Sequence, residues 1–318
     1  MEALITGGTG LIGAEVVRTL AKRGASKLTV FDINDSTQRL DELATSVTIQ
    51  QGDLGESRQV LDVVRKSQPD VIYHLGGMLS LPSDNNPQAA FLANAVGTYN
   101  VLEAARIHGV SKVIFSSTIG TYCQDLDDRP IDDLTLQRPM LFYGACKVFG
   151  EHMGMFYRRK YGIDFRGVRF PSIVGPGVRT PGSVQYTSHM IEESANGRHF
   201  TIWVRPEMRV TLLYVKDAAR AIVELAEAPV EQIQMVNYVL AGPSPSAQEL
   251  ADLVERKIPG ARIDFEIDQE IQARLDKSIH PIDDRFARDE WGWQPTYDLE
   301  ALVDDFLTEL SQHPQRYA

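Results

Sequence analysis

A tyrosine and a lysine one helical turn apart, Tyr143 and Lys147, could act together in proton transfer. On a helix this spacing places the phenol and the ammonium on the same face. A free phenol has a pKa of about 10 and is a poor base at neutral pH, but adjacent positive charge favours the phenolate. Thr118 lies in a preceding cluster of hydroxyl residues and could hydrogen-bond a substrate oxygen. The three residues predict a catalytic site that removes a proton from an alcohol while hydride leaves its carbon.

A glycine-rich segment near the N-terminus predicts a dinucleotide site that would accept the hydride. Its glycines, Gly7, Gly10 and Gly13, lie between a predicted strand and a predicted helix. The first two would let the backbone turn tightly and let a pyrophosphate approach, and the third would let helix and strand pack closely. Amides at the start of the helix, around Leu11 and Ile12, would bind the phosphates with help from the helix dipole.

Asp32 predicts which dinucleotide is bound. It ends the second predicted strand, about 20 residues after the glycine-rich segment, as in many dinucleotide-binding folds. Its carboxylate can accept hydrogen bonds from the ribose hydroxyls of adenosine, and its charge would repel a 2′-phosphate. We therefore expect NAD rather than NADP as the cofactor.

Further candidate cofactor residues come at the ends of later strands. Asp53 and Leu54 end the third strand, Leu75 and Gly76 follow the fourth, and Phe170 ends the sixth. Carboxyl ends of parallel strands share one sheet edge, where ligands bind. His74, in the same region, is expected to be a hydrogen-bonding residue at a strand end rather than a catalyst.

The elements that must position these residues alternate between strand and helix patterns. Such alternation predicts an α/β fold with a doubly wound parallel sheet of the Rossmann type. The predicted strands are Ala3–Thr6, Lys27–Phe31, Val47–Gln50, Val71–His74, Lys112–Ser116 and Asp164–Phe170. The predicted helices between them are Leu11–Arg23, Arg58–Ser67, Pro87–His108 and Phe142–Tyr161.

The pattern changes after Phe170, where the segment 171–177 is rich in residues that break regular structure and predicts a loop. We expect an NAD-binding domain over 1–170, to which 214–240 returns, and a smaller substrate-binding lobe from 171–213 and 241–318. Later elements are predicted as helices at Val215–Ala226, Ala247–Arg256 and Leu299–Leu310 and a strand at Met235–Leu240.

Charge and cysteine content narrow the classes of partner. The net charge of −11 disfavours nucleic acid and anionic membrane surfaces, which would be repelled on average. The cysteines, Cys123 and Cys146, lack metal-ligand spacing, so we expect no metal site. We expect no redox role for Cys123 and a packing role for Cys146. The absence of a signal-like segment or a long apolar run predicts a cytoplasmic protein without a membrane partner.

The combination of motifs resembles the extended short-chain dehydrogenase/reductases, which belong with the NAD-dependent epimerases and dehydratases. The residues that carry this resemblance are Gly7, Gly10, Gly13, Asp32, Asp53, Asn94, Thr118, Tyr143 and Lys147. Within that family the chain is most similar to the epimerase-like L-threonine 3-dehydrogenases. The matching stretches are 117–120, 137–139, 161–166, 283–284 and 287–288.

The resemblance implies a function, a partner and further site residues. It implies hydride transfer to NAD from the β-carbon of a small 2-amino-3-hydroxy acid, and a homodimer formed by the helices near 87–108 and 142–161. It adds Asn94 to the cofactor site. The implied substrate-binding residues are Ser80, Thr118, Arg179, Ser183, Gln185 and Tyr186. Gln185 stands where those enzymes have an acidic residue, so the resemblance predicts the reaction type more firmly than the substrate.

Two alternatives remain open at this stage. A nucleotide-sugar epimerase or dehydratase would use the same tyrosine, lysine and tightly bound NAD, and Arg179, Arg205 and Arg209 could then bind phosphate. The other alternative is an NAD-binding sensor without catalysis, since a fold does not fix a function. The presence of Tyr143 and Lys147 disfavours the sensor, because a protein that only binds needs no base.

Overall fold

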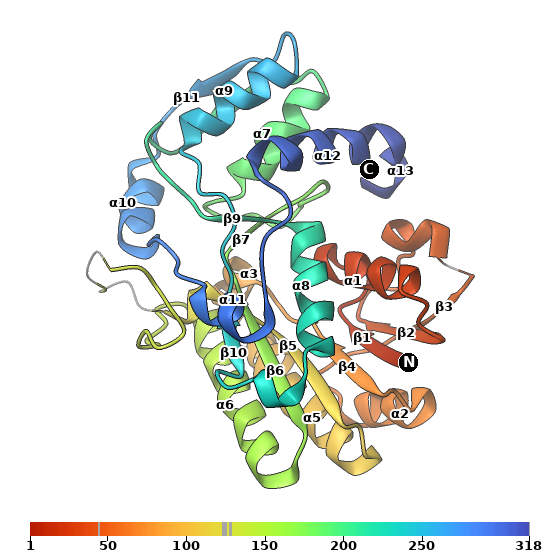
Figure 1. Ribbon diagram of the computed structural model, residues 1–318. Helices are drawn as coiled ribbons and strands as arrows, with labels where there is room; N and C mark the ends of the chain where they lie inside the picture. The colour runs from red at the N-terminus through yellow and green to blue at the C-terminus, as the bar shows by residue number, and fades with distance from the viewer. Residues whose placement is uncertain (44, 123–125, 127–128, 318) are drawn as a thin grey trace.

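A seven-stranded, fully parallel sheet forms the centre of the molecule, as the computed structural model shows for residues 1–43, 45–122, 126 and 129–317 (Figure 1). Its strand order is β10-β6-β5-β4-β1-β2-β3. The bounds are β1 Glu2–Thr6, β2 Lys27–Asp32, β3 Val47–Gln51, β4 Val71–His74, β5 Lys112–Thr118, β6 Asp164–Phe170 and β10 Asn237–Val239. The predicted doubly wound parallel sheet is confirmed. Cys123, for which we expect no redox role, lies outside the described residues.

Both faces of the sheet are buried, so its strands are almost continuously apolar. Successive side chains point to opposite faces. Ala3 and Ile5 therefore join the core beneath α1 and α8, whereas Leu4 joins the core beneath α2 and α5. Helices α1 and α8 lie side by side on one face, and α2, α5 and α6 cover the other (Figure 1).

The helices of this domain are near their predicted positions. Their bounds are α1 Leu11–Lys22, α2 Ser57–Ser67, α3 Ser80–Asn85, α4 Pro87–Ala90, α5 Gly97–His108, α6 Phe142–Tyr161 and α8 Val215–Glu227. Short 3₁₀ segments cover Gln38–Leu43, Ile119–Thr121 and Val230–Gln232. The predicted helix 87–108 is interrupted by a π-helical turn over Phe91–Val96. That turn contains the buried Asn94, and π turns inside helices are frequent at functional sites.

A second hydrophobic core lies above the carboxyl edge of the sheet (Figure 1). Its elements are β7 Ser172–Val174, α7 Tyr186–Ala195, β8 Phe200–Ile202, β9 Leu212–Tyr214, α9 Ala247–Lys257, β11 Ile263–Phe265, α10 Gln269–Ser278 and α12 Leu299–Gln312. Helices α11 Arg285–Trp291 and α13 Pro314–Tyr317 complete the chain's regular structure. The division into two lobes at the predicted boundaries stays a prediction.

The prediction of a loop over 171–177 is wrong for residues 172–174. These residues form β7, which pairs in parallel with β9. Pro171 and Gly175 flank the strand, so the breakers mark its ends rather than a continuous loop. The pairing of segments 40 residues apart gives no local signal, and the three-residue strand is shorter than the periodicity can reveal.

The strand order places a topological switch point at the carboxyl ends of β1 and β4. β1 pairs with β2 on one side and with β4 on the other, so the chain reverses its direction of winding there. Ligands of open α/β sheets bind at such switch points. Among the described helices, none combines the length and apolar character that crossing a bilayer requires.

Helix α6 lies unusually close to the sheet because glycines face it. A Cβ at Gly150 would lie 2.7 Å from the ring of Phe115, and one at Gly154 would overlap the ring of Phe165. The two rings belong to β5 and β6. This close approach brings the first turns of α6, which carry Tyr143 and Lys147, to the carboxyl edge of the same two strands.

Candidate active site

The glycine-rich segment forms a cradle beside the end of β4. Gly7 has a left-handed backbone with φ of +69°, and a Cβ there would lie 2.6 Å from the Cα of Gly76. A Cβ at Gly13 would overlap the carbonyl oxygen of Gly7. We expected Gly13 to permit close packing of helix on strand. The contact that requires glycine is instead with the turn itself.

The N-terminus of α1 is suited to a phosphate. Gly10 is its N-cap, and among the described residues no side chain caps the helix. The first helical amides, of Leu11, Ile12 and Gly13, precede the first intrahelical donor, Ala14, which binds the oxygen of Gly10. Free amides and the helix dipole favour an anion at this position. A glycine cradle beneath an uncapped helix fits the pyrophosphate of a dinucleotide, which agrees with the predicted cofactor.

Asp32 lies next to this cradle at the end of β2. Its carboxylate accepts hydrogen bonds from the backbone N–H of Thr9 at 3.1 Å and of Asn34 at 3.2 Å. These bonds fix the half-buried carboxylate against the glycine turn. Each carboxylate oxygen retains a lone pair for a ribose hydroxyl.

The other predicted cofactor residues lie around the same turn. Leu75 donates its N–H to the carbonyl of Thr6 at 3.2 Å, and Gly76 donates to the Thr6 hydroxyl at 3.2 Å. Leu54 is buried, and a Cβ at Gly76 would lie 2.8 Å from its side chain. Asp53 is exposed and its carboxylate accepts the N–H of Gly55. We propose cofactor roles for these residues from their position alone.

Asn94 ties the π-helical turn to the loop after β4. Its side chain donates to the Met78 carbonyl at 2.9 Å and accepts the Met78 N–H at 2.7 Å. Only 2% of Asn94 is exposed. Its amide therefore fixes the loop that precedes Ser80 and α3. Its connection to the cofactor site runs through that loop.

Thr118 ends β5, directly opposite Phe170 in the ladder with β6. Its hydroxyl oxygen accepts the N–H of Gly120 at 3.1 Å. Accepting this bond orients the hydroxyl and leaves its proton available for a substrate oxygen. The register thus places two of the predicted residues, Thr118 and Phe170, side by side at the sheet edge.

Lys147 extends along α6 towards the end of β5. Its ammonium donates to the Ser116 carbonyl at 2.7 Å and lies 4.8 Å from the centroid of the Phe115 ring. The ring centroid of Tyr143 is 5.6 Å away. Burial lowers the pKa of Lys147 to about 8, while Cys146 and Glu151 act in the opposite direction. The ammonium is therefore largely charged at neutral pH and loses its charge as pH rises past this value.

The phenol of Tyr143 needs more positive charge than Lys147 supplies. We expected adjacent positive charge to favour the phenolate. In the protein alone, burial raises the pKa of Tyr143. The ammonium interacts with the ring face and with a carbonyl rather than with the phenolic oxygen. A second positive charge, such as that of an oxidised nicotinamide, is needed to reverse the effect of burial.

His74 lies between the cradle and Lys147. Its ring nitrogens hydrogen-bond the hydroxyls of Thr6 at 2.8 Å and Thr98 at 3.0 Å. Burial, together with the charge of Lys147, lowers the pKa of His74 to about 3. A neutral imidazole with both nitrogens engaged supports the predicted hydrogen-bonding role.

The predicted substrate residues differ in their burial and in their hydrogen-bond partners. Ser80 begins α3 and is half-buried. Ser183 accepts a hydrogen bond from Arg274 at 3.0 Å, and Tyr186 is buried edge-on against Trp203. Gln185 has a buried side-chain oxygen without a hydrogen-bond partner in the described part of the chain. That oxygen is an acceptor for which the protein supplies no donor.

Arg179 has a different environment from the one we predicted. Its guanidinium pairs with Glu192 at 2.8 Å and donates to the carbonyl of Tyr317. In the described structure, no contact joins it to Thr118 or Tyr143. The guanidinium that a substrate carboxylate would bind is thus already bound to Glu192 on α7 and to the Tyr317 carbonyl on α13. A substrate role for Arg179 therefore finds no support in its contacts.

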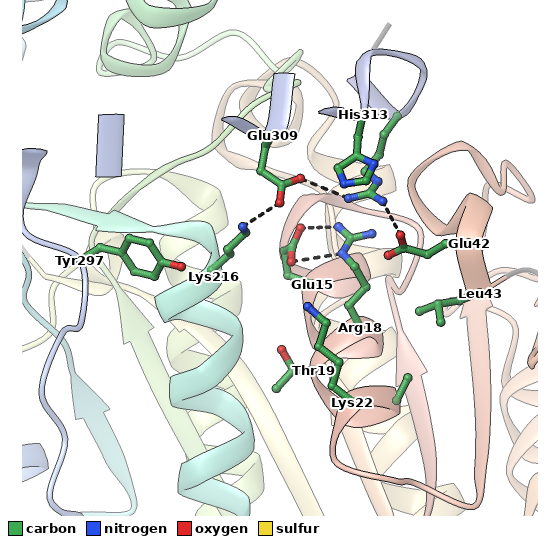
Figure 2. A pocket seen from close by; sticks show the side chains of 12 residues that line it. Glu15, Arg18, Thr19, Lys22, Glu42, Leu43, Lys216, Tyr297, Glu309 and His313 are labelled. Atoms are coloured by element: carbon green, nitrogen blue, oxygen red, sulfur yellow. Dashed lines mark hydrogen bonds and ion pairs between the residues drawn. The ribbon is translucent and has the colours of Figure 1, made fainter. Parts of the chain in front are cut away.

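A cavity of about 540 Å³ lies between α1, α8, α12, α13 and the 3₁₀ segment 38–43 (Figure 2). The ion pairs within it join Glu15 to Arg18, Lys216 to Glu309, and Arg316 to Glu42 and Glu309. None of the predicted catalytic residues lines it. Because these ion pairs satisfy most of the charges that line it, we assign it a structural role. The described residues also contain no cluster of three or more metal-ligating side chains.

Sequence reasoning missed the buried polar groups behind the site. Glu151, Arg169 and Ser117 form a hydrogen-bonded cluster. Arg169 and Ser117 directly precede Phe170 and Thr118 in the sequence, and Glu151 lies one helical turn after Lys147. One signal was available, because Glu151 follows Lys147 by one helical turn on the buried face of α6. An acid at a core position implies a buried partner.

The fold and the site together define an NAD-dependent enzyme of the extended short-chain dehydrogenase/reductase type. The chain belongs to the NAD-dependent epimerase/dehydratase family, whose sequence model matches residues 3–241.

Similar proteins refine this assignment. The mitochondrial L-threonine 3-dehydrogenase of Bos taurus is 31% identical over 308 residues, which cover 96% of this chain and 82% of that protein. The solved holo form of a GalE-like L-threonine dehydrogenase from Cupriavidus necator is 27% identical, with a TM-score of 0.89 over 98% of this chain and 100% of that chain. A monomeric L-threonine 3-dehydrogenase from a metagenome, solved in its apo form, is 25% identical, with a TM-score of 0.88 over 98% and 99%.

The first prediction concerns the phenol. In Tyr143→Phe, turnover should fall by about 10²- to 10⁴-fold, because the proton acceptor is lost. The melting temperature and the dissociation constant of NAD⁺, measured by calorimetry, should stay at wild-type values. Tyr161→Phe, at the exposed far end of the same helix, is the matched control and should keep full activity. Retained turnover in Tyr143→Phe would remove the phenol from the mechanism.

Proposed function

We propose that the protein oxidises the 3-hydroxyl of a small 2-amino-3-hydroxy acid of the threonine type. The observation that carries this proposal is the convergence of Thr118, Tyr143 and Lys147 at the sheet edge beside the Gly7 cradle. The likeness to L-threonine dehydrogenases over nearly the whole chain supports it.

The residues have separate parts in this reaction. NAD⁺, which the Gly7 cradle and Asp32 would hold, would supply the acceptor for the hydride from the carbon that carries the hydroxyl. The Tyr143 phenolate takes the hydroxyl proton, so the C–O bond becomes a carbonyl and charge is conserved. Thr118 donates a hydrogen bond to the same oxygen and holds it near the phenol. Lys147 supplies positive charge next to the ring and anchors α6 to β5 through Ser116.

Gln185 supports an amino group on the substrate. Its side-chain oxygen is buried without a partner, and leaving such an acceptor unsatisfied costs about 1–3 kcal/mol. A substrate ammonium could donate to it and recover that energy. A neutral amide binds an ammonium less strongly than a carboxylate does. We therefore expect binding of the amino acid to be weaker than in a relative with an acid at this position.

The nucleotide-sugar alternative is not favoured by the arginines that prompted it. Arg205 pairs with Asp276 at 2.9 Å, and Arg209 pairs with Glu249. Both side chains are bound to acids on the surface of the second lobe. A sugar diphosphate would have to displace these partners.

The experiment that tests the function is a substrate panel. Purified protein with NAD⁺ is offered L-threonine, L-serine, 3-hydroxybutyrate and UDP-glucose while NADH formation is recorded. We expect the highest kcat/KM with L-threonine, and a lower KM for L-threonine in Gln185→Asp, since a carboxylate suits the ammonium better. The KM for 3-hydroxybutyrate, which has no amino group, should not fall in that variant.

Two results would contradict the proposal. Absence of turnover with every hydroxy acid would remove the dehydrogenase function. Interconversion of UDP-sugars by protein that retains NAD through purification would establish the epimerase alternative instead.

We also propose a homodimer formed through the helices near 87–108 and 142–161. Both carry large apolar side chains that are 41–51% exposed: Phe91, Leu92, Tyr99, Ile107, Phe149 and Tyr161. Clustered apolar exposure of this kind marks interaction surfaces. A monomeric relative exists, so the assembly needs its own test.

The dimer is tested by light scattering after size-exclusion chromatography. We expect a mass of two chains for the wild type and of one chain for Phe149→Glu, because a charge would be buried in the interface. Val230→Glu, at an exposed apolar residue on another surface, should leave the dimer intact. A wild-type monomer at all concentrations would refute the proposal.

The cytoplasmic location is likewise proposed rather than demonstrated. It rests on the residue composition, because two cysteines in 318 residues do not call for an oxidising compartment. The bovine relative is a mitochondrial protein by name, so fractionation of the source cells would have to decide the compartment.

A further inference from the structure

A buried acid lies directly behind the catalytic pair. Glu151 is fully buried on α6, one turn after Lys147. Arg169 binds its carboxylate with two nitrogens, at 3.0 Å and 2.8 Å. The Ser117 hydroxyl and the Gln137 amide also donate to it, the latter at 2.9 Å. Four donors from three separate parts of the chain hold this one carboxylate.

These contacts fix the register of α6 on the sheet. Ser117 and Arg169 are directly paired between β5 and β6, so Glu151 bridges the ends of both strands. The preceding residue, Ser116, binds Lys147 through its carbonyl. Ser116 and Ser117 therefore each bind a residue of α6. The next residue, Thr118, is the predicted contact of the substrate hydroxyl.

Glu151 also acts on the charge of Lys147. Burial favours the neutral amine and lowers the pKa of Lys147 to about 8, and Glu151 and Cys146 oppose this on the same helix. From β4, His74 faces the ammonium as a neutral group. Around the carboxylate stand Arg169 from β6 and, further along the same network, Tyr122 and Asp133. Without the Glu151 carboxylate, Lys147 would lose one of the two groups that raise its pKa, and Arg169 would keep the Asp133 carboxylate as an ionic partner.

We propose that Glu151, held by Arg169, is a positioning residue of the dehydrogenase. It sets the register of α6 against the ends of β5 and β6, and it keeps the ammonium of Lys147 charged. The inference rests on the proposed function for its kinetic consequence. The charge on Lys147 can be measured without turnover.

The test combines a titration with kinetics on Glu151→Gln. Lysine labelled with ¹³C at Cε reports the protonation of Lys147 by NMR, with Lys147→Met used to assign the signal. Loss of the carboxylate should lower the pKa of Lys147 by about one unit or more. At neutral pH kcat should fall about 10- to 100-fold with little change in KM, as expected for a misplaced catalytic group. As the pH is raised, the activity of Glu151→Gln should begin to fall at a lower pH than that of the wild type, because the Lys147 ammonium loses its proton earlier.

Two further variants separate position, charge and general stability. Glu151→Asp keeps the charge but shortens the reach, so Lys147 should titrate as in the wild type while kcat still falls. Asp217→Asn removes another buried acid, which lies on α8 and pairs with Arg220 three residues later. It should lower the melting temperature without moving the titration of Lys147 or the pH profile.

The inference is overturned if Glu151→Gln folds and its Lys147 titrates as in the wild type with kcat retained. It is also overturned if Asp217→Asn shifts the Lys147 titration equally, because the effect would then be one of stability. Should Glu151→Gln not fold, Glu151→Asp decides, and an unchanged kcat in it would refute the positioning role. If no hydroxy acid of the panel is oxidised, the proposed function is refuted. The effect of Glu151 on Lys147 is then decided by the NMR titration alone.

Discussion

The structure depends on an electrostatic conflict at the first turns of α6. The site must exclude water for a hydride to move between bound molecules, yet burial disfavours both charged forms that the chemistry uses. It raises the pKa of Tyr143 and lowers that of Lys147 to about 8. The phenolate and the ammonium are therefore each less favourable here than in water. Opposite charge has to be supplied from nearby, by the cofactor on one side and by Glu151 on the other.

The parallel sheet determines where the catalytic and cofactor-binding groups come together. The carboxyl ends of β1, β4, β5 and β6 lie along one edge, and each contributes a different component. The Gly7 cradle follows β1, the loop fixed by Asn94 follows β4, Thr118 ends β5 and Phe170 ends β6. Glycines on α6 allow the helix to approach β5 and β6 closely enough for Lys147 to reach a strand carbonyl. Packing and catalysis are thus coupled through the same helix.

Features with a local signature could be predicted from the sequence. The six strands of the first half and helix α6 follow from periodicity, and the cradle and Asp32 follow from glycine spacing and strand ends. The three-residue strand β7 and the π-helical turn at Asn94 could not, because both depend on partners distant in sequence. The partners of Arg179 could not be predicted for the same reason, since they lie on α7 and α13. The raised pKa of Tyr143 in the protein alone could not be predicted, because spacing reveals a neighbouring charge but not the depth of burial.

The most direct test of this account is the pKa of Tyr143 with and without cofactor. Tyrosine labelled with ¹³C at Cζ, titrated by NMR, reports the phenol in each state, and the Tyr143→Phe spectrum assigns the signal. The account predicts a pKa above the ordinary value of about 10 in the protein alone, and a decrease of about one unit or more when NAD⁺ is bound. A pKa at or below the ordinary value without NAD⁺, or one that NAD⁺ does not change, would contradict it.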